Sequence, residues 1–110
     1  KPEAELESKR RRRRQIYQQY AAKFEGRSVY ECDRLVVHEL MSELLGERGG
    51  KRLRDEEIGK VGSILLQGPV AQNLKQTEGK EVGITYAMEV LTKAKKAVEK
   101  AHQVDTGMEM

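Results

Sequence analysis

The chain has 110 residues, 37% of them hydrophobic and 35% charged, with one cysteine and a formal net charge of +3. This length suits one domain with a modest core. One cysteine excludes an internal disulfide, and no apolar run approaches the roughly 18 residues of a membrane span. We therefore expect an intracellular protein with no membrane partner, in the cytoplasm or nucleoid, or in the nucleus of a eukaryote.

The positive charge is concentrated at the start of the chain. Residues 1–14 hold seven basic and three acidic side chains, whereas the rest of the chain holds fourteen basic and fifteen acidic ones. The surplus therefore belongs to the first segment, which contains the run Arg10-Arg11-Arg12-Arg13-Arg14. This distribution predicts an anionic partner for the N-terminal segment and a nearly neutral remainder.

An N-terminal helix is expected from about Pro2 to Phe24. Proline suits the first turn of a helix, early glutamates complement the positive end of the helix dipole, and Gly26 marks a stop. An apolar stripe at helical spacing exists only in the second half, from Ile16 onwards. Residues 1–26 thus predict one helix whose basic half projects and whose amphipathic half packs against the rest of the protein.

The remaining helices are expected within residues 27–102. Ser28 and Glu31 have the spacing of a capping box, with Ser28 as the N-cap. The expected bundle helices run from Ser28 to Gly46, from Asp55 to a break at Gly68-Pro69, and from Lys80 to His102, with a short turn of helix from Pro69 to Gln76. Residues 103–110 are expected to form a flexible tail. The predicted fold class is an all-α bundle of four main helices with a projecting basic N-terminal helix.

The last expected helix carries an alanine-rich apolar seam. Its members are spaced alternately three and four residues apart, as in a heptad repeat: Ile84, Ala87, Leu91, Ala94, Val98 and Ala101. Alanine contributes little burial energy, so the seam predicts that another subunit completes it. We expect a homo-oligomer or a subunit of a larger protein assembly.

The arginine run supplies the main candidate site. Successive helical residues step by about 100°, so the side chains of Arg10, Arg11, Arg12, Arg13 and Arg14 point in every direction around the axis. Apolar packing therefore cannot bury any face of this stretch. Guanidinium groups match phosphate oxygens, and phosphate neutralisation drives non-specific nucleic-acid binding. The loop cations Lys51, Arg52 and Arg54 are expected to extend this surface.

The function predicted from these residues is that of a non-enzymatic nucleic-acid-binding subunit that contacts the phosphate backbone of DNA or RNA. A basic run alone carries no base-reading information, so strong sequence preference is not expected. The alternative is a helical adaptor or scaffold that docks on an acidic protein partner, and a targeting signal or a merely solvated run are further readings.

Tyr17 and Tyr20 lie close to the arginines. Aromatic rings beside cations could stack on unpaired bases, and the same spacing equally suits the buried stripe of an amphipathic helix. No spacing of histidine, cysteine or carboxylate side chains indicates a metal site or a catalytic relay, and Cys32 fits a small buried apolar position. The sequence therefore predicts no enzyme, no cofactor and no metal.

Overall fold

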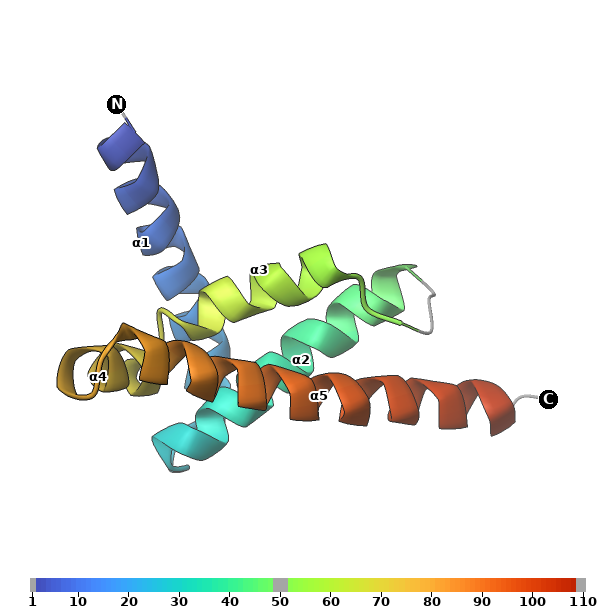
Figure 1. The fold of residues 1–110 in the computed structure, drawn as a ribbon. Coiled ribbons are helices and arrows are strands. Elements are labelled where there is room, and N and C mark those ends of the chain that lie inside the picture. The colour runs from blue at the N-terminus through green and yellow to red at the C-terminus, as the bar shows by residue number, and fades with distance from the viewer. Residues whose placement is uncertain (1, 49–51, 109–110) are drawn as a thin grey trace.

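The computed structural model describes residues 2–48 and 52–108, and over these residues the protein is a helical bundle without strands (Figure 1). The helices are α1 (Pro2–Ala21), a 3-10 turn η1 (Ala22–Phe24), α2 (Val29–Arg48), α3 (Asp55–Leu65), α4 (Pro69–Thr77) and α5 (Lys80–Met108). The predicted all-α fold class is confirmed.

Local residue choices set most helix starts. The backbone N–H of Glu31 donates to Ser28 Oγ at 3.2 Å, which confirms Ser28 as the N-cap of α2. At the start of α3, the Arg54 N–H donates to Glu57 Oε1 at 2.8 Å. Gly26 has a φ of 87°, the left-handed conformation that glycine adopts readily after a helix.

Three helix boundaries differ from those expected. Pro69–Thr77 is a full helix rather than a single turn, since proline in the first turn favours helix. Gly46 does not end α2, which continues to Arg48, because its backbone φ is not positive. The last helix is longer than expected, since α5 continues to Met108.

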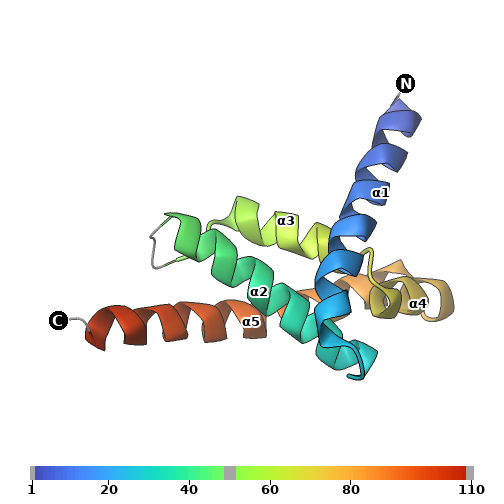
Figure 2. The same cartoon turned by 180° about the vertical axis from the view of Figure 1, so that it is seen from behind.

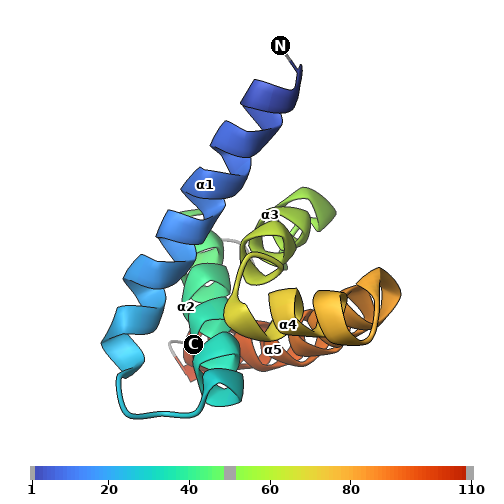
Figure 3. The ribbon, with the colours of Figure 1, turned by 90° about the vertical axis from the view of Figure 1, so that its left-hand side faces the viewer.

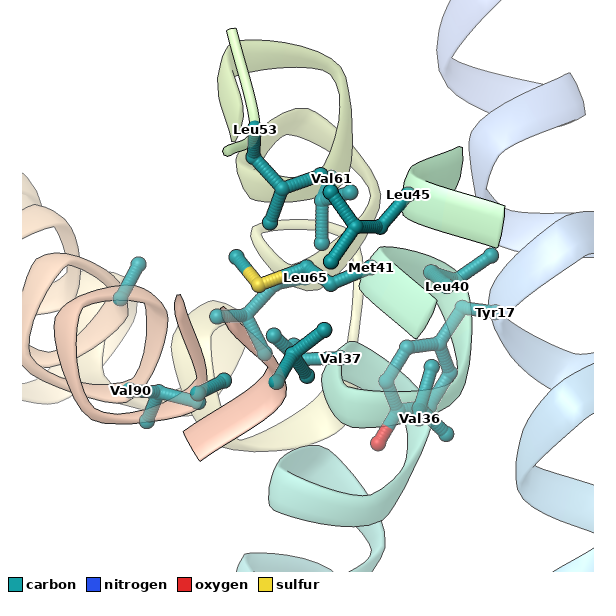
Figure 4. Packing of buried hydrophobic residues seen from close by; sticks show 13 residues of the cluster. Tyr17, Val36, Val37, Leu40, Met41, Leu45, Leu53, Val61, Leu65 and Val90 are labelled. Carbon is teal, nitrogen blue, oxygen red and sulfur yellow. The ribbon is translucent and has the colours of Figure 1, made fainter. Parts of the chain in front are cut away.

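The core is built around α2. Its side chains Val36, Val37 and Met41 are completely buried, and Leu45 is nearly so. They pack with residues from α3, α5 and the loop before α3, and Figure 4 shows this cluster: Leu53, Val61, Leu65 and Val90. Tyr17 is the buried residue that α1 contributes, and its ring lies beside Val36 in Figure 4. One aromatic side chain therefore anchors α1 in the core.

The buried face of α5 differs in part from the predicted seam. Ala87, Ala94 and Val98 are buried within the chain together with Val90, whereas Ile84 is 38% exposed. The face is covered by α2, α3 and α4, all of which contact α5. Packing within one chain therefore accounts for most of the seam from which a second subunit was expected.

The first half of α1 projects from the bundle. Residues 2–12 are all exposed, and Figures 1 and 2 show the N-terminal end of α1 beyond the other helices. Figure 3, seen from the side, shows the same helix leaning over α3 and α4. The second half of α1 packs on α2 and α3.

Candidate nucleic-acid interface

The five arginines lie where α1 leaves the bundle. Arg13 is half-buried and the other four side chains are exposed. Ion pairs in the described part of the chain include Lys23–Glu39 and Arg27–Glu31, each with a nitrogen–oxygen distance of 3.2 Å, and none involves an arginine of the run. No carboxylate in the described part of the chain therefore forms an ion pair with an arginine of the run.

A cationic cleft separates α1 from α3. Its volume is about 270 Å³, and its polar lining comes from Lys9, Arg12 and Arg13 of α1 and from Lys60 and Ser63 of α3. No acidic side chain lines this cleft. Ile16 and Ile64 also line the cleft, and most of its wall is apolar. The four cations that border it have no acidic neighbour in the lining, and cations of this kind pair with phosphate groups.

A second cleft lies on another side of α1, against α4 and α5. Its volume is about 220 Å³, and it brings Arg10 and Arg14 together with Lys75 of α4 and Lys80 of α5. Glu7 also lines this cleft and offsets part of its positive charge. The cationic surface thus extends from α1 onto three other helices.

Lys60, Lys75 and Lys80 were not identified from the sequence. Each stands apart from the other basic clusters along the chain, so charge counting does not detect them. Of the three, only Lys80 is unusual in its sequence position, because a cation at the start of a helix lies at the positive end of the helix dipole. The folded arrangement is what gathers the three lysines around α1.

Two of the expected loop cations, Arg52 and Arg54, lie away from the arginine run. Figures 1 and 2 show that α3 begins at its end remote from α1. Arg52 and Arg54 are exposed there, and Lys51 lies outside the described residues. Arg54 precedes Lys60 by six residues, about 9 Å along a helix. The structure therefore does not join Arg52 and Arg54 to the arginine run.

The structure excludes Tyr17 as a base-stacking residue in this fold. Its side chain is 4% exposed, and its hydroxyl donates to Asp33 Oδ1 at 2.5 Å. Tyr20 is half-buried, donates to Glu43 Oε2 at 2.6 Å and lies beneath Lys23, whose Nζ is 5.0 Å from the ring centroid. The hydrogen bond to Glu43, with burial second, raises the pKa of Tyr20 to about 12.

A buried carboxylate joins three helices beneath the interface. Asp33 of α2 is 0% exposed, and its two oxygens accept hydrogen bonds from Tyr17 of α1 and Tyr86 of α5, each at 2.5 Å. Burial raises the pKa of Asp33, although the two tyrosine hydrogen bonds oppose that effect. Burial, reinforced by the hydrogen bond to Asp33, raises the pKa of both tyrosines above the ordinary value of 10.0.

Another groove lies between α2 and α5. It has a volume of about 430 Å³, and its lining includes Arg34, His38 and Lys93 beside the rings of Tyr30 and Tyr86. The two rings meet edge to face, with centroids 6.3 Å apart. No residue of α1 lines this groove, so it is separate from the arginine surface.

Fold and site together define the class of the molecule: a helical bundle that carries an exposed cationic helix flanked by lysines of the bundle. Comparisons of the chain with protein families, curated proteins and solved structures find no match. Within residues 2–48 and 52–108, no helix combines the length and apolarity that crossing a membrane requires. In the same described ranges, no three histidine, cysteine, aspartate or glutamate side chains are grouped so that they could hold a metal ion.

Proposed function

We propose that this protein is a non-enzymatic nucleic-acid-binding subunit that contacts the phosphate backbone through Arg10–Arg14. The observation that carries the proposal is the convergence of Lys60, Lys75 and Lys80 on an arginine run that has no carboxylate partner among the described residues. Clustered cations attract a polyanion and release its condensed counterions on binding. The protein would act within a larger assembly, with its neutral bundle available to partner subunits.

The test is the salt dependence of binding to a labelled oligonucleotide. If four or five phosphates are neutralised, the logarithm of the affinity should fall with the logarithm of the salt concentration at a slope of roughly −3 to −5. The triple variant Arg10→Ala, Arg12→Ala, Arg14→Ala should flatten this slope by roughly 2 to 3, because it removes three phosphate contacts.

A charge-matched control comes from the far end of α5. Lys93, Lys96 and Lys100 are exposed there, and their replacement by alanine removes the same charge while leaving α1 intact. An unchanged slope in the arginine variant, or an equal change in the lysine control, would show that the run is not the contact. If no oligonucleotide binds at physiological salt, the alternative of an adaptor for an acidic protein surface is favoured instead.

A further inference from the structure

The cations of α1 other than Arg11 lie on two separate flanks of the helix. At about 100° per residue, Lys9, Arg12 and Arg13 cluster on one flank, and Arg10 and Arg14 cluster about 130° away around the axis. Tyr17, which anchors the helix in the core, points between the two flanks. Each flank faces its own cleft, and the bundle contributes Lys60 to one cleft and Lys75 and Lys80 to the other.

A third face of α1 points away from the bundle. Ala4, Ser8, Arg11 and Gln15 follow one another at intervals of four, three and four residues, so they form one stripe opposite Tyr17. All four are exposed. The stripe holds no carboxylate, and its first two residues are small. Arginine pairs with the major-groove edge of guanine, and glutamine with that of adenine.

These three faces fit one kind of ligand. A helix with its side chains is about 10–12 Å across, and the major groove of B-form DNA is about 12 Å wide with a phosphate strand on each side. A helix seated there has base edges in front of it and phosphates on both flanks. The major groove of A-form RNA is too deep and narrow for side chains to read, and a single strand would occupy one flank.

We infer that α1 is a recognition helix that enters the major groove of duplex DNA, an inference that rests on the proposed function. The stripe of Ser8, Arg11 and Gln15 faces the base edges. One DNA strand passes along the α3 side, where Lys60 contacts it, and the other passes along the α4 and α5 side, where Lys75 and Lys80 contact it. The sequence suggested no base recognition by the arginine run, whereas this arrangement places Arg11 where it can contact the base edges.

The acidic residues of α1 limit the contact to its basal part. Glu3 and Glu5 lie near the tip of the helix and repel phosphates, so the contact stretch is residues 8–15, next to the bundle lysines. Glu7 lies in the cleft with Arg10 and Arg14. Replacement Glu7→Gln is therefore expected to strengthen binding to duplex DNA several-fold and to leave the α3 flank unchanged.

The experiment compares one sequence as duplex DNA, duplex RNA and single-stranded DNA by fluorescence anisotropy. Duplex DNA is expected to bind at least tenfold more tightly than either other form. Lys60→Ala and the pair Lys75→Ala, Lys80→Ala should each flatten the salt slope, by about one per lysine, whereas Lys96→Ala should not. A dye that occupies the major groove should compete, and netropsin, which occupies the minor groove, should not.

Base reading is tested with a random duplex pool, from which the protein selects a preferred sequence. Arg11→Ala and Gln15→Ala are each expected to reduce the preference at one base position by about 5- to 150-fold while the helical content measured by circular dichroism stays unchanged. These two variants should alter selectivity more than the salt slope, because Gln15 carries no charge and Arg11 contributes at most one phosphate contact.

The results separate the inference from the proposed function. Equal affinity for duplex RNA, or displacement by netropsin alone, overturns the recognition helix. So does an unchanged slope in all of the bundle lysine variants. If the arginine triple variant still weakens binding in these cases, backbone contact through α1 stands and only the groove assignment fails. If the arginine variant also binds as the wild type does, both fail together.

Discussion

Replacement Tyr86→Phe tests the buried carboxylate that holds the bundle together. The variant removes one hydroxyl from a pair that supplies one donor to each oxygen of Asp33. Asp33 is 0% exposed, so the variant leaves one of its buried oxygens without a protein donor. A hydrogen bond to a charged group contributes about 1.5–3 kcal/mol, and we expect the free energy of unfolding to fall by that amount.

The other members of the network give a graded series. Tyr17→Phe should cost about as much as Tyr86→Phe, about 1.5–3 kcal/mol, since it also removes one donor. Asp33→Ala leaves two tyrosine hydroxyls without a partner and should cost about 2–4 kcal/mol. Asp33→Asn should cost less than Asp33→Ala, because its oxygen accepts from one tyrosine and its amide donates to the other while the buried charge disappears.

The assay is equilibrium urea denaturation followed by circular dichroism at neutral pH. Tyr30→Phe is the matched control: Tyr30 is 55% exposed, and its hydroxyl has no hydrogen-bond partner among the described residues. Its free energy of unfolding should stay within about 0.5 kcal/mol of the wild type. A Tyr86→Phe variant as stable as the control, or an Asp33→Asn variant less stable than Asp33→Ala, would refute the reasoning.

Three further predictions concern pH, backbone space and the core. The pKa values of Tyr17 and Tyr86 are raised above 10.0, and that of Tyr20 is raised to about 12, so the folded state holds these protons longer. Between about pH 10 and pH 12 the unfolding free energy should therefore fall by about 1.4 kcal/mol per pH unit for each of the three tyrosines. Tyr17→Phe and Tyr86→Phe should each remove about a third of that slope in denaturation series at rising pH. Gly68→Ala would place a Cβ 2.7 Å from the Tyr17 ring and 3.2 Å from the Leu65 carbonyl oxygen. The free energy of unfolding, measured by urea denaturation, should therefore fall by about 1–3 kcal/mol. Gly59→Ala is the control, because its Cβ would meet nothing within 4 Å, and it should stabilise α3 by about 0.5–1 kcal/mol. Met41→Ala should cost about 2–5 kcal/mol, and a loss under 1 kcal/mol would mean that α2 is not the centre of the core.

Local rules account for most of the helix boundaries. The N-cap at Ser28, the acidic start at Asp55 and the break at Gly68-Pro69 each depend on residues within one turn of the boundary, and each prediction agrees with the structure. The end of α2 differs from the prediction, because the expected stop at Gly46 lies inside the helix. A glycine ends a helix reliably only where the backbone turns to positive φ, as at Gly26 and Gly79.

The network at Asp33 could have been anticipated in part. Asp33 shares a helical face with Val36, Val37 and Leu40, and a carboxylate on an apolar face needs a buried donor. The sequence could not say which donor it is, because Tyr86 lies 53 residues away and reaches Asp33 only when α5 packs on α2. The sequence could not predict the positions of Lys60, Lys75 and Lys80 for the same reason, since they approach α1 only through tertiary packing.

The anchor of α1 and its basic surface depend on each other. Like charges three and four residues apart in the run repel, and most of the stability of a helix in a protein comes from tertiary packing. The second half of α1 supplies this packing, because Tyr17 donates a hydrogen bond to Asp33 and its ring lies against Gly68. The arginine stretch therefore continues a helix whose other half is already stabilised by the core. A helix held in place before binding loses less conformational entropy when it meets its partner. Tyr17→Phe should therefore weaken nucleic-acid binding without removing any charge, and its salt slope should equal that of the wild type.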